Sequence, residues 1–154
     1  MKKLWLVGIL LAIVLAADRF TKLAFMKTST LGGRFAIGNV LSFTQHENHG
    51  VIANLPVPQW IIILCTLVAL GVLIMLLKRA LATGTTLQVT GLAMTIGGAL
   101  GNLWDRLQWS FVFDWILVVN RSILNLADIA IGAGLLIYFL ARTNNAPTLD
   151  GRES

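Results

Sequence analysis

Four long apolar stretches restrict this chain to a helical bundle that fits a lipid bilayer. Hydrophobic residues make up 56% of its 154 residues and charged residues only 12%, and the mean hydropathy is +0.79. A helix needs about 20 apolar residues to cross the hydrocarbon core. Three stretches approach or reach that length, and the first can continue past Asp18 towards Phe25. The stretches are residues 4–17, 60–77, 87–104 and 123–140.

The sequence therefore predicts an all-α membrane protein with four transmembrane helices, forming one integral-membrane domain over residues 1–154. The predicted spans are about residues 4–22, 60–77, 87–105 and 123–141, followed by a polar C-terminal tail at 143–154. Between the first two spans, residues 35–44 are rich in strand-forming side chains. We expect a small extracytoplasmic β-element or amphipathic lid there, and short loops elsewhere, at 78–86 and 107–122.

Basic residues next to the spans favour cytoplasmic termini. The twelve Lys and Arg residues divide six to six between the two sides, but the predicted inner segments are much shorter. The pairs Lys2-Lys3 and Lys78-Arg79 also directly adjoin span ends, where the positive-inside rule is strongest. The start of the chain is similar to a cleavable signal peptide as well. We expect it to be retained, because the rest of the chain is itself polytopic.

Composition also argues against several classes of function. The net charge of +5 does not indicate nucleic-acid binding, because the basic residues are scattered and not interleaved with aromatic ones. His46, Glu47 and His49 lie close in sequence, but no distant His or Cys completes a metal site. The single Cys65 cannot form an intramolecular disulfide. We therefore expect no metal and no cofactor.

Two aspartates lie where a membrane makes a charge costly. Asp114 is in Phe-Val-Phe-Asp-Trp-Ile-Leu, and Asp128 is in Leu-Asn-Leu-Ala-Asp-Ile-Ala-Ile. Ionisable groups at membrane depth are usually functional and usually paired. Two carboxylates at the edges of apolar segments indicate a shared acid/base role.

Other polar residues share helix faces near the same span ends. Gly98, Asn102 and Arg106 recur every four residues on the third span, and Gly97 and Gly101 form a small-xxx-small pair that lets another helix approach. Asp18 and Lys22 share one face of the first helix, where they form either a site support or an interfacial ion pair. Asn125 shares a face with Asp128 and is either a helix cap or a site residue.

Together these motifs resemble the bacterial lipoprotein signal peptidase family, signal peptidase II. The matching segments run in order from residue 4 to about 141. They are Asp18-Arg-Phe-Thr-Lys22, Asn48-His-Gly50, Gly97-Gly-Ala-Leu-Gly-Asn-Leu-Trp-Asp-Arg106, Phe113-Asp114-Trp-Ile and Asn125-Leu-Ala-Asp128.

The resemblance implies an intramembrane aspartic endopeptidase of the bacterial inner membrane, with its active site near the outer face. Its substrates would be prolipoproteins carrying a diacylglyceryl group on a cysteine, cut on the N-terminal side of that cysteine. Asp114 and Asp128 match the family's catalytic pair. Its only other implied partners are membrane lipids, and we expect a monomer. The positions that match residues shaping or supporting the site are Asp18, Lys22, Asn48, Gly50, Gly98, Asn102, Arg106 and Asn125.

Three positions depart from the family pattern. Ala53 stands where the family commonly has a phenylalanine, and Leu124 stands where it often has one. The segment between Asp114 and Asp128 is also shorter than the family leads us to expect, which affects the shape of the outer connection.

The two carboxyl groups suit peptide hydrolysis when they share one proton. The ionised group takes a proton from water while the protonated group hydrogen-bonds the scissile carbonyl. The main alternative is a small proton or ion carrier, which predicts titratable groups throughout the membrane depth. In this chain Asp18, Asp114 and Asp128 instead map to the outer edge, and the second and third spans lack charge in mid-membrane. A non-catalytic assembly factor would leave Asp114 and Asp128 without a role.

Overall fold

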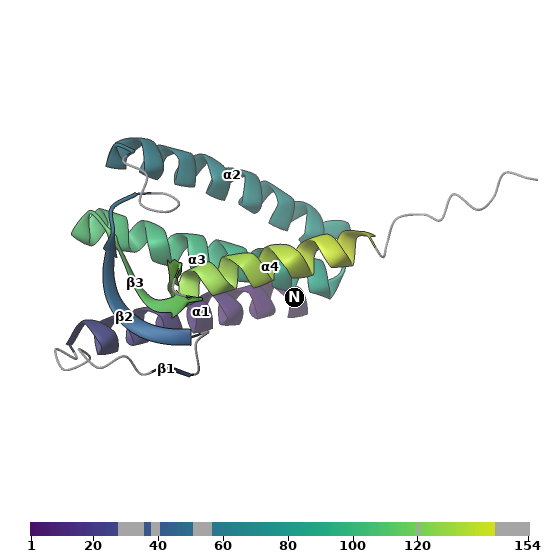
Figure 1. The fold of residues 1–154 in the computed structure, drawn as a ribbon. Helices are drawn as coiled ribbons and strands as arrows, with labels where there is room; N and C mark the ends of the chain where they lie inside the picture. Colours follow the sequence, from purple (N-terminus) through teal and green to yellow (C-terminus); the bar gives the residue numbers. More distant parts are fainter. Residues whose placement is uncertain (28–35, 38–40, 51–56, 120, 144–154) are drawn as a thin grey trace, which may run out of the picture.

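The computed structural model describes residues 1–27, 36–37, 41–50, 57–119 and 121–143. Four helices run alongside one another, and a small sheet lies at one end of the bundle (Figure 1). The helices are α1 (Lys2–Lys27), α2 (Gln59–Thr83), α3 (Thr86–Trp109) and α4 (Leu126–Thr143). The strands are β1 (Ala36–Ile37), β2 (Leu41–Asn48), β3 (Val112–Val118) and β4 (Ser122–Leu124).

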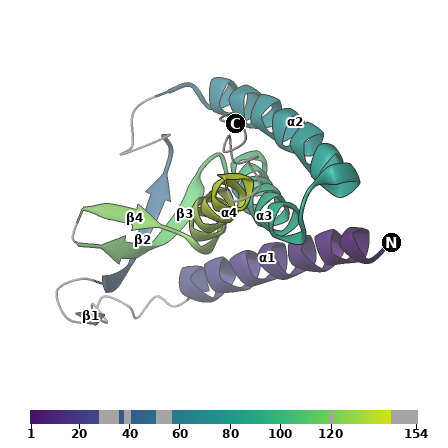
Figure 2. The ribbon, with the colours of Figure 1, turned by 90° about the vertical axis from the view of Figure 1, so that its right-hand side faces the viewer.

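Three of the helices, α1, α2 and α4, are long and apolar enough to cross a membrane. Helix α3 contains more glycine and polar residues, and it is the central helix that contacts the other three. Figure 2 shows α1 and α2 on opposite sides of α3 and α4. Helices α1, α2 and α3 extend beyond the apolar stretches predicted as spans, whereas α4 begins three residues after the predicted start at 123. Residues 78–83, predicted as loop, form the last turns of α2.

Local signals set the ends of α3. Thr85 accepts a hydrogen bond from the Gln88 N–H, and the Gln88 side chain accepts one from the Thr85 N–H, which makes a capping box. The helix ends at Trp109 and is capped by Ser110, whose φ of 63° lies in the left-handed region. The turn between α2 and α3 is also tied to the start of α1, because Lys3 Nζ donates to Gly84 O at 2.7 Å.

Small residues bring α3 close to its neighbours. A Cβ on Gly91 would lie 2.5 Å from Gly134 O of α4, and a Cβ on Gly97 would lie 3.1 Å from Val14 of α1. A Cβ on Gly98 would collide with Ala127 O. The predicted close approach at Gly97 is therefore present, and the space beside Gly98 is filled by α4.

The sheet is antiparallel with strand order β1-β2-β3-β4. The β-element expected between the first two helices is present as β1 and β2, but the sheet also contains two strands from later in the chain. Strand β3 and the first residue of β4, Ser122, come from the predicted 107–122 loop, whereas Ile123 and Leu124, predicted as helix, form the rest of β4. The first five residues of β3 are buried. Trp115 stacks on Phe25 of α1 with ring centroids 4.1 Å apart and also contacts Phe43 of β2, so tertiary packing holds the strand.

Candidate active site

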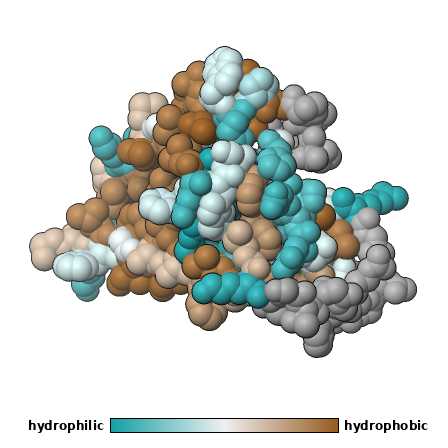
Figure 3. All heavy atoms as spheres, turned by 90° about the vertical axis from the view of Figure 1, so that its left-hand side faces the viewer, coloured by the Kyte–Doolittle hydropathy of each residue, from teal (hydrophilic) through white to brown (hydrophobic). Residues whose placement is uncertain are grey.

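A cavity of about 650 Å³ opens at the sheet end between the sheet, α3 and α4. Asp114 and Asp128 both line it. Its walls are partly apolar, with Val112, Ile123, Leu124 and Ile131 among the lining residues. Polar side chains gather over the middle of this end of the molecule, beside a flank covered by apolar side chains (Figure 3).

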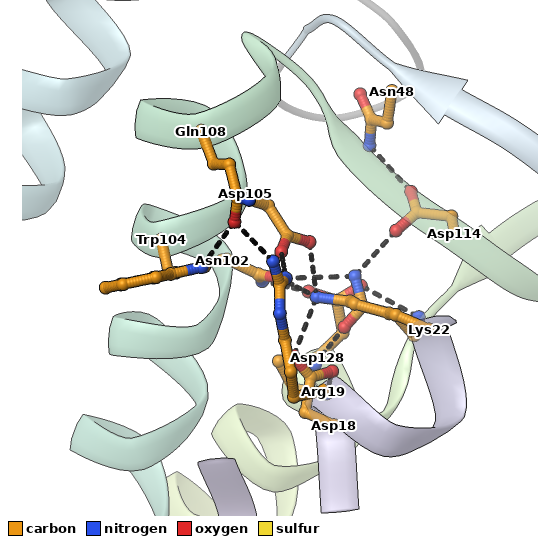
Figure 4. A network of polar contacts seen from close by, with 12 residues as sticks. Asp18, Arg19, Lys22, Asn48, Asn102, Trp104, Asp105, Gln108, Asp114 and Asp128 are labelled. Carbon is orange, nitrogen blue, oxygen red and sulfur yellow. Dashed lines mark hydrogen bonds and ion pairs between the residues drawn. The ribbon is translucent and has the colours of Figure 1, made fainter. Parts of the chain in front are cut away.

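Asp114 is held on β3 by two amide donors. Its side chain is buried, with the residue 1% exposed. Asn125 Nδ2 donates to Asp114 Oδ1 at 2.6 Å, and Asn48 Nδ2 donates to Oδ2 at 2.9 Å. The contact with Asn48, which comes from the end of β2, is visible in Figure 4. Both oxygens of this carboxyl group are therefore fixed.

Asp128 is held in the first turn of α4. Its Oδ1 accepts a hydrogen bond from Asn102 Nδ2 at 2.8 Å, and its Oδ2 accepts one from the Asn125 backbone N–H at 3.2 Å. In return, the Asp128 N–H donates to Asn125 Oδ1 at 2.9 Å. Asn125 therefore has both of the contacts that the sequence suggested: its oxygen caps α4, and its Nδ2 donates to Asp114.

Lys22 determines which way the amide groups point. Lys22 is fully buried, and its Nζ donates to Asn102 Oδ1 at 3.2 Å. A lysine can only donate, so the Asn102 oxygen faces Lys22 and the Asn102 amide nitrogen faces Asp128. Asn102 Oδ1 also accepts from Asn125 Nδ2 at 3.2 Å. Both aspartates consequently receive N–H donors, which stabilise the ionised carboxylate.

The surroundings of Asp114 bring the pKa of its carboxyl group closer to neutral pH. The pKa of Asp114 is raised to about 6, chiefly by burial and also by the charge of Asp128. The hydrogen bonds from Asn48 and Asn125 and the charge of Lys22 act in the opposite direction. A carboxyl group with such a pKa can hold or release a proton near pH 6, as acid/base chemistry requires.

A buried ion cluster supports this network from α1 and α3 (Figure 4). Lys22 Nζ lies 2.8 Å from Asp18 Oδ2 and 2.7 Å from Asp105 Oδ2. Asp18 Oδ1 also accepts the Ala127 N–H at 3.0 Å, at the start of α4. The ion pair predicted between Asp18 and Lys22 is present, and it is a buried support of the network.

Sequence reasoning missed two members of this cluster, Asp105 and Arg19. Asp105 is fully buried, and Arg19 Nη1 lies 2.6 Å from Asp105 Oδ1. The two residues are 86 positions apart, so no local spacing connects them. The available signal was the position of Asp105 inside the Gly-Asn-Leu-Trp-Asp-Arg segment.

The remaining predicted site residues have two different positions. Arg106 and Asn48 bond to Gly50 just after β2, and Gly98 packs against α4. Arg106 Nη2 donates to Gly50 O at 3.0 Å, and the Gly50 N–H donates to Asn48 Oδ1 at 3.1 Å. This leaves the Asn48 amide nitrogen directed at Asp114. Gly98 does not line the cavity and instead packs on α4. Ala53 lies outside the described residues.

The connection between Asp114 and Asp128 runs through the paired strands β3 and β4. Strands β3 and β4 pair directly, and the Arg121 N–H donates to Val118 O at 3.0 Å. The two strands return the chain to Asn125 at the start of α4.

The residues considered as metal ligands do not form a metal site among the described residues. Glu47 Oε2 and His49 Nε2 are 3.5 Å apart, with both side chains 61% exposed. No group of three His, Cys, Asp or Glu residues that could hold a metal ion occurs within the described ranges.

Comparison with known proteins identifies the family. The family model described as "Signal peptidase (SPase) II" matches residues 10–143. A lipoprotein signal peptidase of Halothermothrix orenii is 33% identical over 139 residues, covering 88% of this chain and 94% of the relative. One from Lactococcus lactis is 32% identical over 145 residues, covering 92% and 95% respectively.

The fold agrees with solved structures of membrane enzymes. A structure titled "Bacterial membrane enzyme structure by the in meso method at 2.3 A resolution" has a TM-score of 0.82 and 23% identity, covering 96% of this chain and 93% of that one. A second, with the same title at 1.9 A resolution, has a TM-score of 0.78 and 23% identity, covering 91% and 94%. The chain therefore belongs to the signal peptidase II family, and it is an integral membrane protease of the lipoprotein signal peptidase type.

Proposed function

We propose that the chain is an intramembrane aspartic endopeptidase that cuts diacylglyceryl-modified prolipoproteins on the N-terminal side of the lipidated cysteine. The observation that carries the proposal is the pair Asp114 and Asp128, which line one cavity and are joined through Asn125. Asn125 bonds Asp114 through its side chain and Asp128 through its backbone, so both carboxyl groups are held against one residue.

The pair can carry out hydrolysis without a metal or a covalent intermediate. One carboxylate removes a proton from water, and the oxygen of that water attacks the scissile carbonyl carbon. The protonated carboxyl group donates its hydrogen to the carbonyl oxygen. When the tetrahedral intermediate collapses, the C–N bond breaks and a carboxyl group delivers a proton to the leaving amine. The two groups share one proton, so the pair titrates as a unit.

The apolar wall of the cavity suits a lipid-modified substrate. Ile123 and Leu124 from β4 and Ile131 from α4 lie on the same cavity as the dyad. Burying a methylene group stabilises a complex by about 0.8 kcal/mol. An alkyl chain on the cysteine can therefore contribute binding that an unmodified cysteine cannot.

The architecture supports a four-span topology with cytoplasmic termini and the dyad near the outer face. Helix α3 follows α2 after a two-residue connection and leads back to the sheet end, where α4 begins. Its 24 residues cover about 36 Å, which exceeds a hydrocarbon core of roughly 30 Å. Lys3 contacts Gly84 at the opposite end from the sheet, so the basic residues there mark the cytoplasmic side.

The test is cleavage of a purified prolipoprotein by the purified chain. The diacylglyceryl-modified substrate should be cut and the unmodified one should remain intact. Asp114→Asn and Asp128→Asn should each abolish cleavage, whereas Glu47→Gln, which removes an exposed carboxylate on β2, should retain it. Cleavage by either Asn variant would remove that residue from the dyad, and equal cleavage of both substrates would end the lipid requirement.

A measurement of proton flux distinguishes a proton carrier from a peptidase. The acidic residues of the described helices, Asp18, Asp105 and Asp128, belong to the sheet-end network. A carrier would move protons into liposomes under a pH gradient, and Asp128→Asn would stop that movement. A peptidase with this structure should show no such flux.

A further inference from the structure

A second cavity, of about 710 Å³, lies between α1 and α3 on the other side of α3 from the active site. We call it the α1–α3 groove. Gly101, Trp104 and Gln108 of α3 face it, whereas Asn102 and Arg106 face the active-site cavity. Trp104 points away from Asp114 in Figure 4. The complete lining is Leu15, Asp18, Arg19, Leu23, Leu100, Gly101, Leu103, Trp104, Leu107, Gln108 and Trp109.

Most of the α1–α3 groove is apolar and has the length of one membrane leaflet. Five leucines line it, and those of α1 extend from Leu15 to Leu23. Eight residues of helix cover about 12 Å, close to half of a hydrocarbon core of roughly 30 Å. Leu23 and Leu107 are exposed at 40% and 66%. In an integral membrane protein such a surface faces acyl chains.

Arg19 places a positive charge in this groove. Arg19 Nη1 donates to Asp105 Oδ1 at 2.6 Å and Nη2 donates to Gln108 Oε1 at 2.5 Å. Its guanidinium carbon lies 4.2 Å from the Trp109 ring centroid and 6.0 Å from that of Trp104. Tryptophan favours the level of the lipid head-groups, so both rings and the guanidinium mark the head-group end of the groove.

The ion cluster contains two cations and two carboxylates, so its formal charges balance, and Arg19 is the charged member that the groove exposes. Asp105 is shared between Lys22 and Arg19, and Lys22 is shared between Asp105 and Asp18. Asp18 receives a further donor from the start of α4. Arg19 is the cluster member with the most exposed side chain, at 26%, and the described contacts use two of its five N–H groups. Guanidinium groups bind phosphate through paired N–H donors.

We propose that the α1–α3 groove binds one anionic phospholipid, with an acyl chain along the leucines and the phosphate against Arg19. A diacylglycerol lacks the phosphate that the guanidinium would bind, a zwitterionic phospholipid carries a compensating cation beside its phosphate, and a water-soluble phosphate lacks the chain that fills the groove. The site is separate from the dyad, so lipid binding and peptide cleavage can be measured independently.

The experiment is native mass spectrometry of the full chain in a neutral detergent. The probes are dioleoyl phosphatidylglycerol, dioleoyl phosphatidylcholine, dioleoylglycerol and glycerol 3-phosphate. One phosphatidylglycerol should bind about tenfold more tightly than phosphatidylcholine, consistent with one charge-assisted hydrogen-bonded pair. Dioleoylglycerol should bind more weakly still, and glycerol 3-phosphate should not be retained.

Gln108→Glu is the sharpest variant, because it keeps the oxygen that accepts from Arg19 and Trp104 while adding a charge that repels phosphate. It should abolish the preference for phosphatidylglycerol without loss of thermal stability. Gln59→Glu adds the same charge at the start of α2, at the same end of the bundle, and should leave the preference unchanged. Arg19→Gln should also abolish it, whereas Lys27→Gln should not.

The proposal is overturned if Gln108→Glu retains the tenfold preference or if Gln59→Glu loses it equally. It is also overturned if phosphatidylglycerol and phosphatidylcholine bind the unmodified chain alike, or if glycerol 3-phosphate binds as tightly as the lipid.

Discussion

Asn125 has two separable functions, and two substitutions should divide them. Its oxygen caps α4, while its Nδ2 donates to Asp114. Asn125→Ser keeps a good cap residue but removes the donor, and Asn125→Ala removes both. Both variants lose the hydrogen bond to Asp114, so the cap is measured by their difference, and the alanine variant should be about 1 kcal/mol less stable than the serine variant.

The lost donor should alter the chemistry in both variants. A hydrogen bond to a charged group contributes about 1.5–3 kcal/mol, and 1.4 kcal/mol corresponds to one pKa unit. Because the donor favours the ionised form of Asp114, its removal raises the pKa of this carboxyl group. The acidic limb of the pH–rate profile should move upward by about one pH unit, and kcat should fall roughly tenfold or more.

The assays are thermal unfolding in detergent and cleavage of a lipid-modified prolipoprotein between pH 5 and 8. Unchanged kcat and an unchanged acidic limb in Asn125→Ser would refute the assignment of Asn125 as the donor that positions Asp114. Equal stability of the serine and alanine variants would refute its role as the cap of α4.

Three further predictions follow from the same geometry. Because the folded pKa of Asp114 is raised to about 6, its ionisation should destabilise the fold as pH rises from about 4 to 6, by up to about 3 kcal/mol. Melting curves at pH 4 and 8 should therefore show that Asp114→Asn gains stability relative to the unmodified chain only at the higher pH, and a gain of the same size at pH 4 would contradict this cause. Asp105→Asn leaves Lys22 and Arg19 without their shared carboxylate and should cost about 3 kcal/mol in a chemical unfolding titration, whereas an unchanged midpoint would show that the cluster adds nothing. Gly98→Ala should push α4 away from α3, cost about 1–3 kcal/mol and reduce kcat, while Gly71→Ala, which has nothing within 4 Å of its added Cβ, should be nearly neutral in the same two assays; an equal effect of both would exclude helix separation as the cause.

The sequence predicted the helices well because their signal is local. Apolar length identified four segments that the structure contains as helices, and the small-residue pattern at Gly97 predicted the approach of α1. Helix ends were less accurate, since residues 78–83 continue α2 beyond its apolar run. The sheet was half missed because Val112–Val118 is held by contacts with Phe25 and Phe43, which come from elsewhere in the chain.

For the candidate site, the sequence alone determined which residues are chemically suited and which helix faces they share. It also determined the family, because the motifs occur in one order. Tertiary structure decided that Lys22 orients Asn102 towards Asp128, that Asp105 joins Arg19 and that Asp18 binds the start of α4. The contact of Asp18 with Ala127 joins residues 109 positions apart. Helix periodicity reaches only a few residues along the chain, so the direction of each hydrogen bond depends on how the helices and the sheet pack together.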